Sequence, residues 1–231
     1  MELEDFPLRF KKGVPAAFFE DYSIMGDIHL GFEKEMEESG YNVWDKTEEI
    51  LGNILKLGTK KLIMLGDLRA GFSEIFPDEG GILFRFLSNL SRNFDEVIIT
   101  KGNHDGGLSK LTSRLNNITL CTEFVHGSVG FMHGHTLPSK EFVESARLAC
   151  FGHLHPSIIL RDSNGASYRN DCWLLIDFKF PKKLSSKVKL SNGLAFPTFN
   201  RYVGGSDAIN KKGIMKYAKV TGRLTLNLAM L

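Results

Sequence analysis

Short apolar runs recur along the chain, and each one ends at glycine and polar residues. They span residues 16–25, 61–65, 97–100, 129–132 and 148–151. Because the runs are short and often β-branched, each is predicted to form a buried strand. Residues 46–57 and 80–90, between the first three runs, carry apolar side chains at helical spacing. This alternation of strand and helix predicts a core sheet of parallel strands.

The pattern changes after residue 119, where hairpins replace the alternation. Two hairpins are expected, with strands at 122–126 and 129–132 about Gly127-Ser128, and at 157–160 and 172–178 about a turn at 162–165. Residues 181–193 are rich in lysine and serine and are predicted to form a loop or flap. Residues 216–231 are expected to supply one or two closing strands around Thr221-Gly222. The whole pattern predicts two sheets with helices outside them.

The composition is that of an average soluble globular protein, with 42% hydrophobic and 24% charged residues. A length of 231 residues suggests one large domain over residues 1–231, at about 150 residues per domain. The net charge of +2 excludes a protein whose whole surface grips nucleic acid, so any polyanion site must be local. The longest apolar runs fall short of the roughly 18 residues that span a bilayer.

The cysteines and the first residues indicate the compartment. Cys121, Cys150 and Cys172 lack CxxC spacing, so they are predicted to be buried thiols in a reducing compartment. Residues 1–5 hold three acids and no basic segment, which does not fit a signal peptide. We expect a cytoplasmic monomer or small oligomer without a membrane partner.

Residues able to bind metal follow all five apolar runs. In open α/β sheets, the loops beyond the carboxyl ends of the strands converge on the ligand crevice. Six of the seven histidines stand in these loops, and only His126 lies outside them. The set comprises Asp27, His29, Asp67, Asn103, His104, His133, His135, His153 and His155. This concentration predicts a metal site.

Spacing and ligand type narrow the prediction. Asp27 and His29 are two residues apart, as are His153 and His155, so in extended backbone each pair points to one side. A carboxylate such as that of Asp67 can bridge two cations. Oxygen and imidazole ligands without thiolate favour Mn²⁺, Fe²⁺ or Zn²⁺. Because the ligands are too many for one catalytic ion with open positions, two ions roughly 3.5–4 Å apart are predicted.

These residues resemble the calcineurin-like metallophosphoesterase family, whose five-block signature they match in order over residues 26–155. The blocks are Asp27-Ile28-His29, Gly66-Asp67, Gly102-Asn103-His104-Asp105, His133-Gly134-His135 and Gly152-His153-Leu154-His155. A closer likeness is to small archaeal and bacterial phosphoesterases of this superfamily, at residues 26–33 and at Pro197-Thr198-Phe199-Asn200 followed by Gly204-Gly205. The resemblance implies a four-layer α/β/β/α sandwich of two mixed sheets flanked by helices.

The resemblance also implies a role for each residue. One metal is expected on Asp27, His29 and His155, and a second on Asn103, His133 and His153, with Asp67 bridging the two. His104 is expected to face the substrate as general acid for the leaving alkoxide, while a hydroxide activated by the metals attacks phosphorus. Mn²⁺ is the expected ion, with Zn²⁺, Fe²⁺ and Ni²⁺ as alternatives, although the affinity order of most such ligand sets favours Zn²⁺ over Mn²⁺.

One position departs from the family pattern. Many relatives carry Asp or His three residues after the Asp of the second block, as a partner for the catalytic histidine, whereas this chain has Ala70. The partner of His104 is therefore absent from that place or supplied by another group, and Asp105 is one candidate. Arg69 is expected either to clamp a phosphate or to be a solvated surface residue.

Three further features have two interpretations each. His133 is favoured over His135 as the ligand, which leaves His135 beside the metal or facing the substrate. Gly204-Gly205 either approaches the site closely or forms a plain turn. The third feature is a lysine run with two aromatic residues, which forms either a nucleic-acid-binding flap or a solvated loop: Lys179, Lys182, Lys183, Lys187, Lys189, Phe178 and Phe180.

The resemblance implies hydrolysis of phosphodiesters, in nucleic acid or a cyclic nucleotide, because some close relatives are associated with DNA-repair helicases. The same association implies a helicase-type partner. Within the class, the alternative is a phosphomonoesterase or protein phosphatase. Outside it, the alternative is a non-catalytic subunit of a nucleic-acid-processing complex, although such relatives usually lose several of the ligands that this chain keeps.

Overall fold

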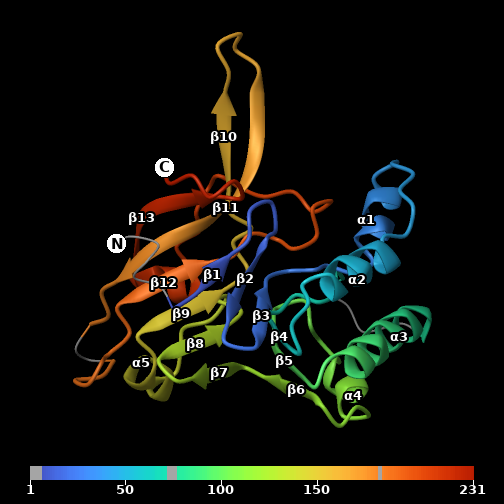
Figure 1. Cartoon of the computed structure of the whole chain (residues 1–231), viewed down its shortest axis with the longest axis horizontal. Coiled ribbons are helices and arrows are strands. Elements are labelled where there is room, and N and C mark those ends of the chain that lie inside the picture. The colour runs from blue at the N-terminus through green and yellow to red at the C-terminus, as the bar shows by residue number, and fades with distance from the viewer. Residues whose placement is uncertain (1–6, 72–76, 182–183) are drawn as a thin grey trace.

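Two mixed β-sheets carry the fold in a computed structural model, which describes residues 7–71, 77–181 and 184–231 (Figure 1). In spatial order, the described strands of the first sheet are β1 (Arg9–Phe10), β2 (Ala16–Phe19), β3 (Tyr22–Met25), β4 (Lys61–Met64), β5 (Glu96–Thr100) and β6 (Ile118–Cys121). Those of the second sheet are β10 (Ser157–Arg161), β11 (Ser167–Phe178), β12 (Asn192–Ala195), β9 (Leu148–Phe151), β8 (Val129–Met132) and β7 (Glu123–His126), and β13 (Ala218–Thr225) also pairs with β11.

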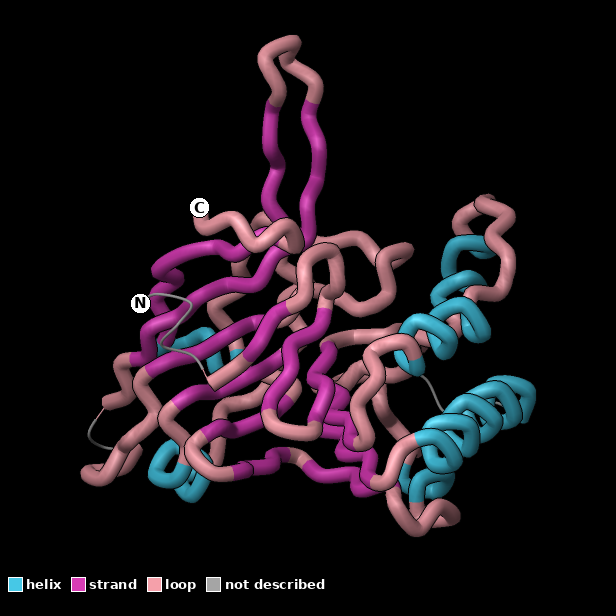
Figure 2. The backbone as a smooth tube through the Cα atoms, in the orientation of Figure 1, coloured by secondary structure: helices cyan, strands magenta, loops and turns pink. Residues whose placement is uncertain are grey.

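Helices lie outside the two sheets, as expected (Figure 2). Those described are α1 (Phe32–Glu38), α2 (Thr47–Leu55), α3 (Pro77–Asn93), α4 (Ser109–Thr112), α5 (Lys140–Ser145) and the 3₁₀ helix η2 (Gly213–Tyr217). The apolar faces of α2 and α3 pack on the first sheet, and α5 and η2 pack on the second. The predicted four-layer sandwich is therefore confirmed, with a thinner helical layer on the second sheet.

Successive residues of an inner strand belong to different cores. In β4, Leu62 and Met64 pack beneath the helices, whereas Ile63 packs between the two sheets. None of the three is more than 2% exposed. Burial of such a side chain stabilises the fold by about 1.5–3 kcal/mol, and burial on both faces explains why β4 is a continuous apolar run.

Both sheets contain the parallel strands that the alternation predicts. Strands β3 to β6 pair in parallel in the first sheet, and β8, β9 and β12 do so in the second. The two predicted helices are present as α2 and α3. The predicted hairpin of β7 and β8 is confirmed. The second hairpin is present, but β10 pairs with residues 167–171 of β11, whereas the predicted partner strand, 172–178, pairs with β12 and β13.

One local prediction is wrong and another is confirmed. Residues 16–25 form a hairpin of β2 and β3 rather than one strand, because Glu20 takes a left-handed φ of 49° and reverses the chain. The predicted closing strand around Thr221-Gly222 is present as β13. The pairing of β13 with β11 shifts between Leu175 and Ile176, so the extra residue forms a bulge in a continuous strand.

The lysine-rich segment lies at the edge of the second sheet where the parallel strands β9 and β12 begin. This edge is opposite the C-terminal ends of β8 and β9. It leads into β12, which starts within the predicted loop and pairs in parallel with β9 from Asn192 opposite Leu148. Phe178 is buried, and its ring lies 5.3 Å from that of Phe180, so these aromatics belong to the core. Lys187 and Lys189 are exposed, which favours the solvated loop; Lys182 and Lys183 lie outside the described residues.

A two-stranded arm projects from the body of the molecule (Figure 1). This β-arm, residues 157–171, pairs β10 with the outer part of β11 from Ser157 opposite Asp171 to Arg161 opposite Ser167. The inner part of β11 continues into the second sheet. Among the helices described, none is long and apolar enough to cross a membrane.

Candidate metal centre

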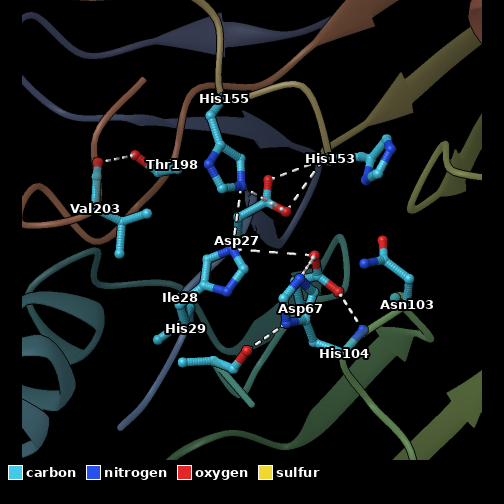
Figure 3. A network of polar contacts seen from close by, with 12 residues as sticks. Asp27, Ile28, His29, Asp67, Asn103, His104, His153, His155, Thr198 and Val203 are labelled. Carbon is cyan, nitrogen blue, oxygen red and sulfur yellow. Dashed lines mark hydrogen bonds and ion pairs between the residues drawn. The ribbon is translucent and has the colours of Figure 1, made fainter. Parts of the chain in front are cut away.

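The predicted ligands all follow the C-terminal ends of inner strands. Because the inner strands of each sheet are parallel, these ends gather at one edge of each sheet, and the side chains converge (Figure 3). The first sheet supplies Asp27 and His29 after β3, Asp67 after β4, and Asn103 and His104 after β5; the second supplies His133 after β8, and His153 and His155 after β9.

Asp27, His29 and His155 form a first cluster, in which one potential ligand atom from each lies within 4.8 Å of the others. The Nε2 atoms of His29 and His155 are 3.1 Å apart, and Nε2 of His155 is 3.5 Å from Oδ1 of Asp27. Asp27 is fully buried, and both its oxygens accept from the backbone N–H of His153. Two imidazole nitrogens facing each other beside a carboxylate suit a shared cation.

Asp67, His133 and His153 form a second cluster of the same kind. Nε2 of His133 lies 3.2 Å from Oδ2 of Asp67 and 3.2 Å from Oδ1 of Asn103. Nδ1 of His133 donates to the carbonyl oxygen of Leu65 at 2.7 Å, which orients Nε2 toward the cluster. Asn103 thus adds a fourth donor beside this group.

Asp67 faces both clusters. Its Oδ2 lies 3.2 Å from Nε2 of His133 and 4.0 Å from Nε2 of His29. Its other oxygen, Oδ1, accepts from the backbone N–H of His104 at 3.0 Å. The carboxylate of Asp67 therefore lies between an imidazole of the first cluster and an imidazole of the second.

The ligand pairs do not lie in extended backbone, contrary to the expectation from spacing. Positive φ angles occur at Asp27 (21°), His29 (49°), Asp67 (48°), His153 (69°) and His155 (44°). Such left-handed conformations cost of order 1–3 kcal/mol each and persist only where the surroundings impose them. As a result, His153 and His155 do not share a side but reach different clusters.

Glycines beside the ligands leave room for them. A Cβ atom on Gly102 would collide with Oδ1 of Asp67, and one on Gly152 would lie 2.5 Å from Oδ2 of Asp27. The carboxylates of the two clusters therefore occupy the space that side chains at these glycines would fill. These two contacts give a physical reason for Gly102 in the third block and for Gly152 in the fifth.

Burial and charge set the protonation of the imidazoles. Burial lowers the pKa of His29 and of His153 to about 4, so both are neutral at pH 7 and present lone pairs. Burial also opposes the charge of His133, but its hydrogen bond to Asp67 and the charges of Asp27 and Asp67 outweigh this and raise its pKa to about 9. The second cluster therefore holds a proton that a cation would displace.

His104 stands at the rim of the centre with its Nε2 3.8 Å from Oδ2 of Asp67. Its Nδ1 is hydrogen-bonded to the backbone carbonyl of Ala70. A carbonyl only accepts, so Nδ1 donates and Nε2 is the atom that faces the centre. The backbone carbonyl at position 70 is thus a partner of the His104 imidazole, although the residue there is alanine.

Asp105 and Arg69 hold the loops behind the centre. The fully buried Asp105 accepts from the backbone N–H of Leu68 and of Gly102, both at 2.8 Å, and so joins the second block to the third. Arg69 is 1% exposed and makes a bidentate ion pair with Glu79 of α3 at 2.6 and 2.8 Å. The interpretation of Arg69 as a solvated surface residue is therefore wrong.

His135 lies beside the second cluster, with its ring 5.2 Å from that of His133 and 6.0 Å from that of His153. Its Nδ1 is buried and has no hydrogen-bond partner among the described residues, which is rare for a ring nitrogen. This orphaned atom and the donor set of carboxylate, amide and imidazole groups fit divalent cations such as Mn²⁺ or Zn²⁺.

The sequence pattern predicted no role for residues 198–203, a segment that supports the first cluster. The backbone N–H of Phe199 donates to the carbonyls of Gly26 and Asp27, and the fully buried Asn200 donates from Nδ2 to the carbonyl of Ile28 at 2.8 Å. Within this segment, the hydroxyl of Thr198 donates to the carbonyl of Val203 at 3.5 Å (Figure 3). The likeness at residues 197–200 was the available signal. Gly205 approaches His155 closely, so the plain-turn interpretation is wrong.

Comparison with known proteins identifies the family. The model of the calcineurin-like phosphoesterases matches residues 23–174, which is more than half of the chain. The chain therefore belongs to the calcineurin-like phosphoesterase family, and its broad activity is the hydrolysis of phosphoesters.

Among solved structures, the chain is similar to the Pseudomonas putida nuclease MPE, with a TM-score of 0.60 at 17% identity over 95% of this chain and 96% of that chain. This likeness shows a shared fold. A protein of unknown function from Aquifex aeolicus matches at a TM-score of 0.41 and 20% identity, over 58% of this chain and 78% of that chain. No curated protein gave a significant match.

Proposed function

We propose that the chain is a dimetal-dependent phosphodiesterase. The observation that carries the proposal is the position of Asp67, whose Oδ2 lies between the imidazole of His133 and that of His29. One carboxylate serving two clusters is the arrangement expected of two cations about 3.5–4 Å apart.

Each of the two cations would be held by the residues of one cluster. Asp27, His29 and His155 would hold the first, Asn103, His133 and His153 the second, and Asp67 both. When bound, two such cations lower the pKa of water to generate a nucleophile and neutralise the charge that develops on a phosphoryl group. The buried carboxylates keep this charge balanced, and the hydrogen bond from His133 to Leu65 fixes one imidazole in place.

His104 would supply the proton that the leaving group requires. Nε2 faces the centre because Nδ1 donates to the carbonyl of Ala70. In its protonated form, Nε2–H can pass its proton to the leaving alkoxide as the P–O bond breaks. The backbone carbonyl orients this ring without requiring a carboxylate at position 70.

A diester is the proposed substrate because a solved structure that shares the fold across almost the whole chain is named a nuclease. The complete donor set favours an enzyme over a non-catalytic subunit, which would have no use for two strained ligand clusters. Phosphomonoesterase activity is tested by the same experiment.

The test measures hydrolysis of bis-p-nitrophenyl phosphate and p-nitrophenyl phosphate by protein loaded with Mn²⁺. We expect turnover of the diester to exceed that of the monoester. His104→Ala should lose about 10²–10⁴-fold in kcat and still bind two metals, because it loses the proton donor alone. His126→Ala is the matched control, since this half-exposed histidine pairs with Glu20 at 2.9 Å outside the centre and should keep full activity.

Two results would overturn the proposal. Faster hydrolysis of the monoester would make the chain a phosphomonoesterase. Absence of hydrolysis with saturating Mn²⁺, Zn²⁺, Fe²⁺ or Ni²⁺, on these esters and on nucleic acid, would make it a non-catalytic member of the family.

A further inference from the structure

Residues 199–206, here called the bridging loop, connect two ligand-bearing segments of the first cluster. At one end, Phe199 and Asn200 hydrogen-bond to the backbone of residues 26–28. At the other end, the backbone N–H of Ser206 donates to the carbonyl of His155 at 2.7 Å. The loop is therefore anchored beside the first cluster at both ends, and its middle residues, Arg201 and Tyr202, are exposed.

The charge of Arg201 acts on the same carboxylate as the charge of His155, a residue of the first cluster. Burial raises the pKa of Asp171 at the base of the β-arm, and the charges of Arg201, Arg169 and His155 oppose this rise. Gly204 of the bridging loop also lies against Arg169, because a Cβ atom there would be 3.6 Å from Nη1 of that side chain.

The bridging loop forms one wall of a pocket of about 530 Å³. This volume lies within the range of about 300–1,000 Å³ that is typical of small-ligand sites. The apolar lining comes from three parts of the chain, namely Val14, Pro15, Ile50, Leu57 and Phe199. A flat apolar group such as a nucleobase suits this lining.

The charged side chains of the lining are predominantly cationic, with Lys11, Lys56 and Arg201. None of the three belongs to an ion pair within the described ranges of the chain. The one carboxylate of the lining, Glu49, is already engaged by the hydroxyl of Tyr202 at 2.9 Å and by Lys46 at 3.2 Å. The pocket therefore presents the positive charges of these three side chains around an apolar lining.

Tyr202 is a fixed aromatic wall of this pocket. Its ring stacks on that of Phe32 at 6.0 Å with an interplanar angle of 11°, and its hydroxyl is held by Glu49. Phe32 begins α1, three residues after the ligand His29. The ring of Tyr202 is thus connected to the first cluster through the start of α1 as well as through the bridging loop.

We propose that this pocket is a substrate subsite that binds the nucleotide adjacent to the scissile phosphodiester of a nucleic-acid strand. The base would lie on the apolar lining, and its phosphate would meet Lys11, Lys56 and Arg201. The nucleotide must be unpaired to insert its base, so the substrate class is single-stranded nucleic acid. This inference rests on the proposed function, because it places the scissile phosphate at the metal centre.

The experiment compares two substrates that differ in whether they can reach the pocket. A single-stranded DNA oligonucleotide carries flanking nucleotides, and bis-p-nitrophenyl phosphate carries none. In Lys56→Ala/Arg201→Ala, we expect KM for the oligonucleotide to rise about tenfold more than KM for the small diester. The slope of log binding constant against log salt should fall in magnitude by about 1.4, because two phosphate-binding cations are lost.

Lys187→Ala/Lys189→Ala is the matched control, since it removes the same charge from exposed lysines of the loop that precedes β12. It should leave both KM values and the salt slope unchanged. An equal effect of the two double variants, or equal losses on both substrates, would overturn the subsite. Cleavage of the small diester but not of the oligonucleotide by the wild type would also overturn it.

Failure of the proposed function is distinguished by binding. If the wild type hydrolyses neither substrate, fluorescence anisotropy of the labelled oligonucleotide on the Mn²⁺-loaded protein still tests the pocket. A loss of affinity confined to Lys56→Ala/Arg201→Ala would support the subsite without catalysis, and equal affinities would reject it.

Discussion

The two sheets differ in the chemistry that they bring to the centre. The first sheet supplies both carboxylates and the amide, together with His29 and His104, whereas the predicted ligands from the second sheet are imidazoles alone. Neither the first nor the second cluster comes from one sheet alone, although one potential ligand atom from each of His29, Asp67 and His104, all of the first sheet, also lies within 4.8 Å of the others. The first cluster takes His155 from the second sheet, and the second cluster takes Asp67 from the first.

This division places the centre at the seam between the sheets. The core that joins them contains Ile24, Ile63 and Ile98 from the first sheet and Phe131 and Trp173 from the second. The relative position of the sheets therefore sets the distances between ligands. The difference teaches that metal binding here depends on packing between sheets as well as on the residues that face the cations.

The largest effect is expected where one residue serves both clusters. Asp67→Asn keeps the shape but removes the charge that faces His133 and His29, so we expect activity to fall by more than about a hundredfold and bound metal to drop from two ions toward one. Hydrolysis assays and metal analysis of the purified variant measure both. Asp95→Asn, at an exposed carboxylate before β5, should retain wild-type values. Full metal content in Asp67→Asn would contradict the bridging role.

The next largest effect is expected from the proton of His133, a residue of the second sheet that interacts with two carboxylates of the first. The carboxylates of Asp67 and Asp27 on the first sheet raise the pKa of His133 on the second sheet to about 9, so a cation must displace a proton below that pH. Affinity for Mn²⁺ should therefore fall roughly tenfold for each pH unit below about 9 and level off above it. Calorimetry in buffers of different ionisation enthalpy should count one proton released near neutral pH. An affinity that does not vary with pH would reject this coupling.

The smallest effect is expected from two substitutions on opposite faces of β4. Ile63→Ala and Leu62→Ala each remove a fully buried side chain from β4 and should each lower the free energy of unfolding by about 2–5 kcal/mol. Ile63 faces the other sheet, whereas Leu62 faces the helices. We expect about tenfold weaker Mn²⁺ binding from Ile63→Ala alone, because it loosens the seam. Equal affinities in the two variants, measured by titration at a temperature where both are folded, would argue against a role for the seam.

Much of the fold could be predicted from the periodicity of the sequence. The runs that became β4, β5, β8 and β9 are apolar because both faces of each strand are buried, and the helical spacing of α2 and α3 reflects one buried face. The hairpin of β2 and β3 was missed because a left-handed Glu20 is not a recognised turn signal. The bulge in β13 depends on its pairing with β11, which lies far away in the sequence.

The sequence by itself determined the types of ligand and their order, since five blocks of acidic, amide and imidazole side chains follow apolar runs. It also determined the family. Only the tertiary structure decided which ligands come together, because both clusters combine loops from different sheets and because left-handed backbone sends His153 and His155 to different clusters. The carbonyl of Ala70 and the bridging loop likewise acquire their contacts only through folding, since a backbone group has no signature in the sequence.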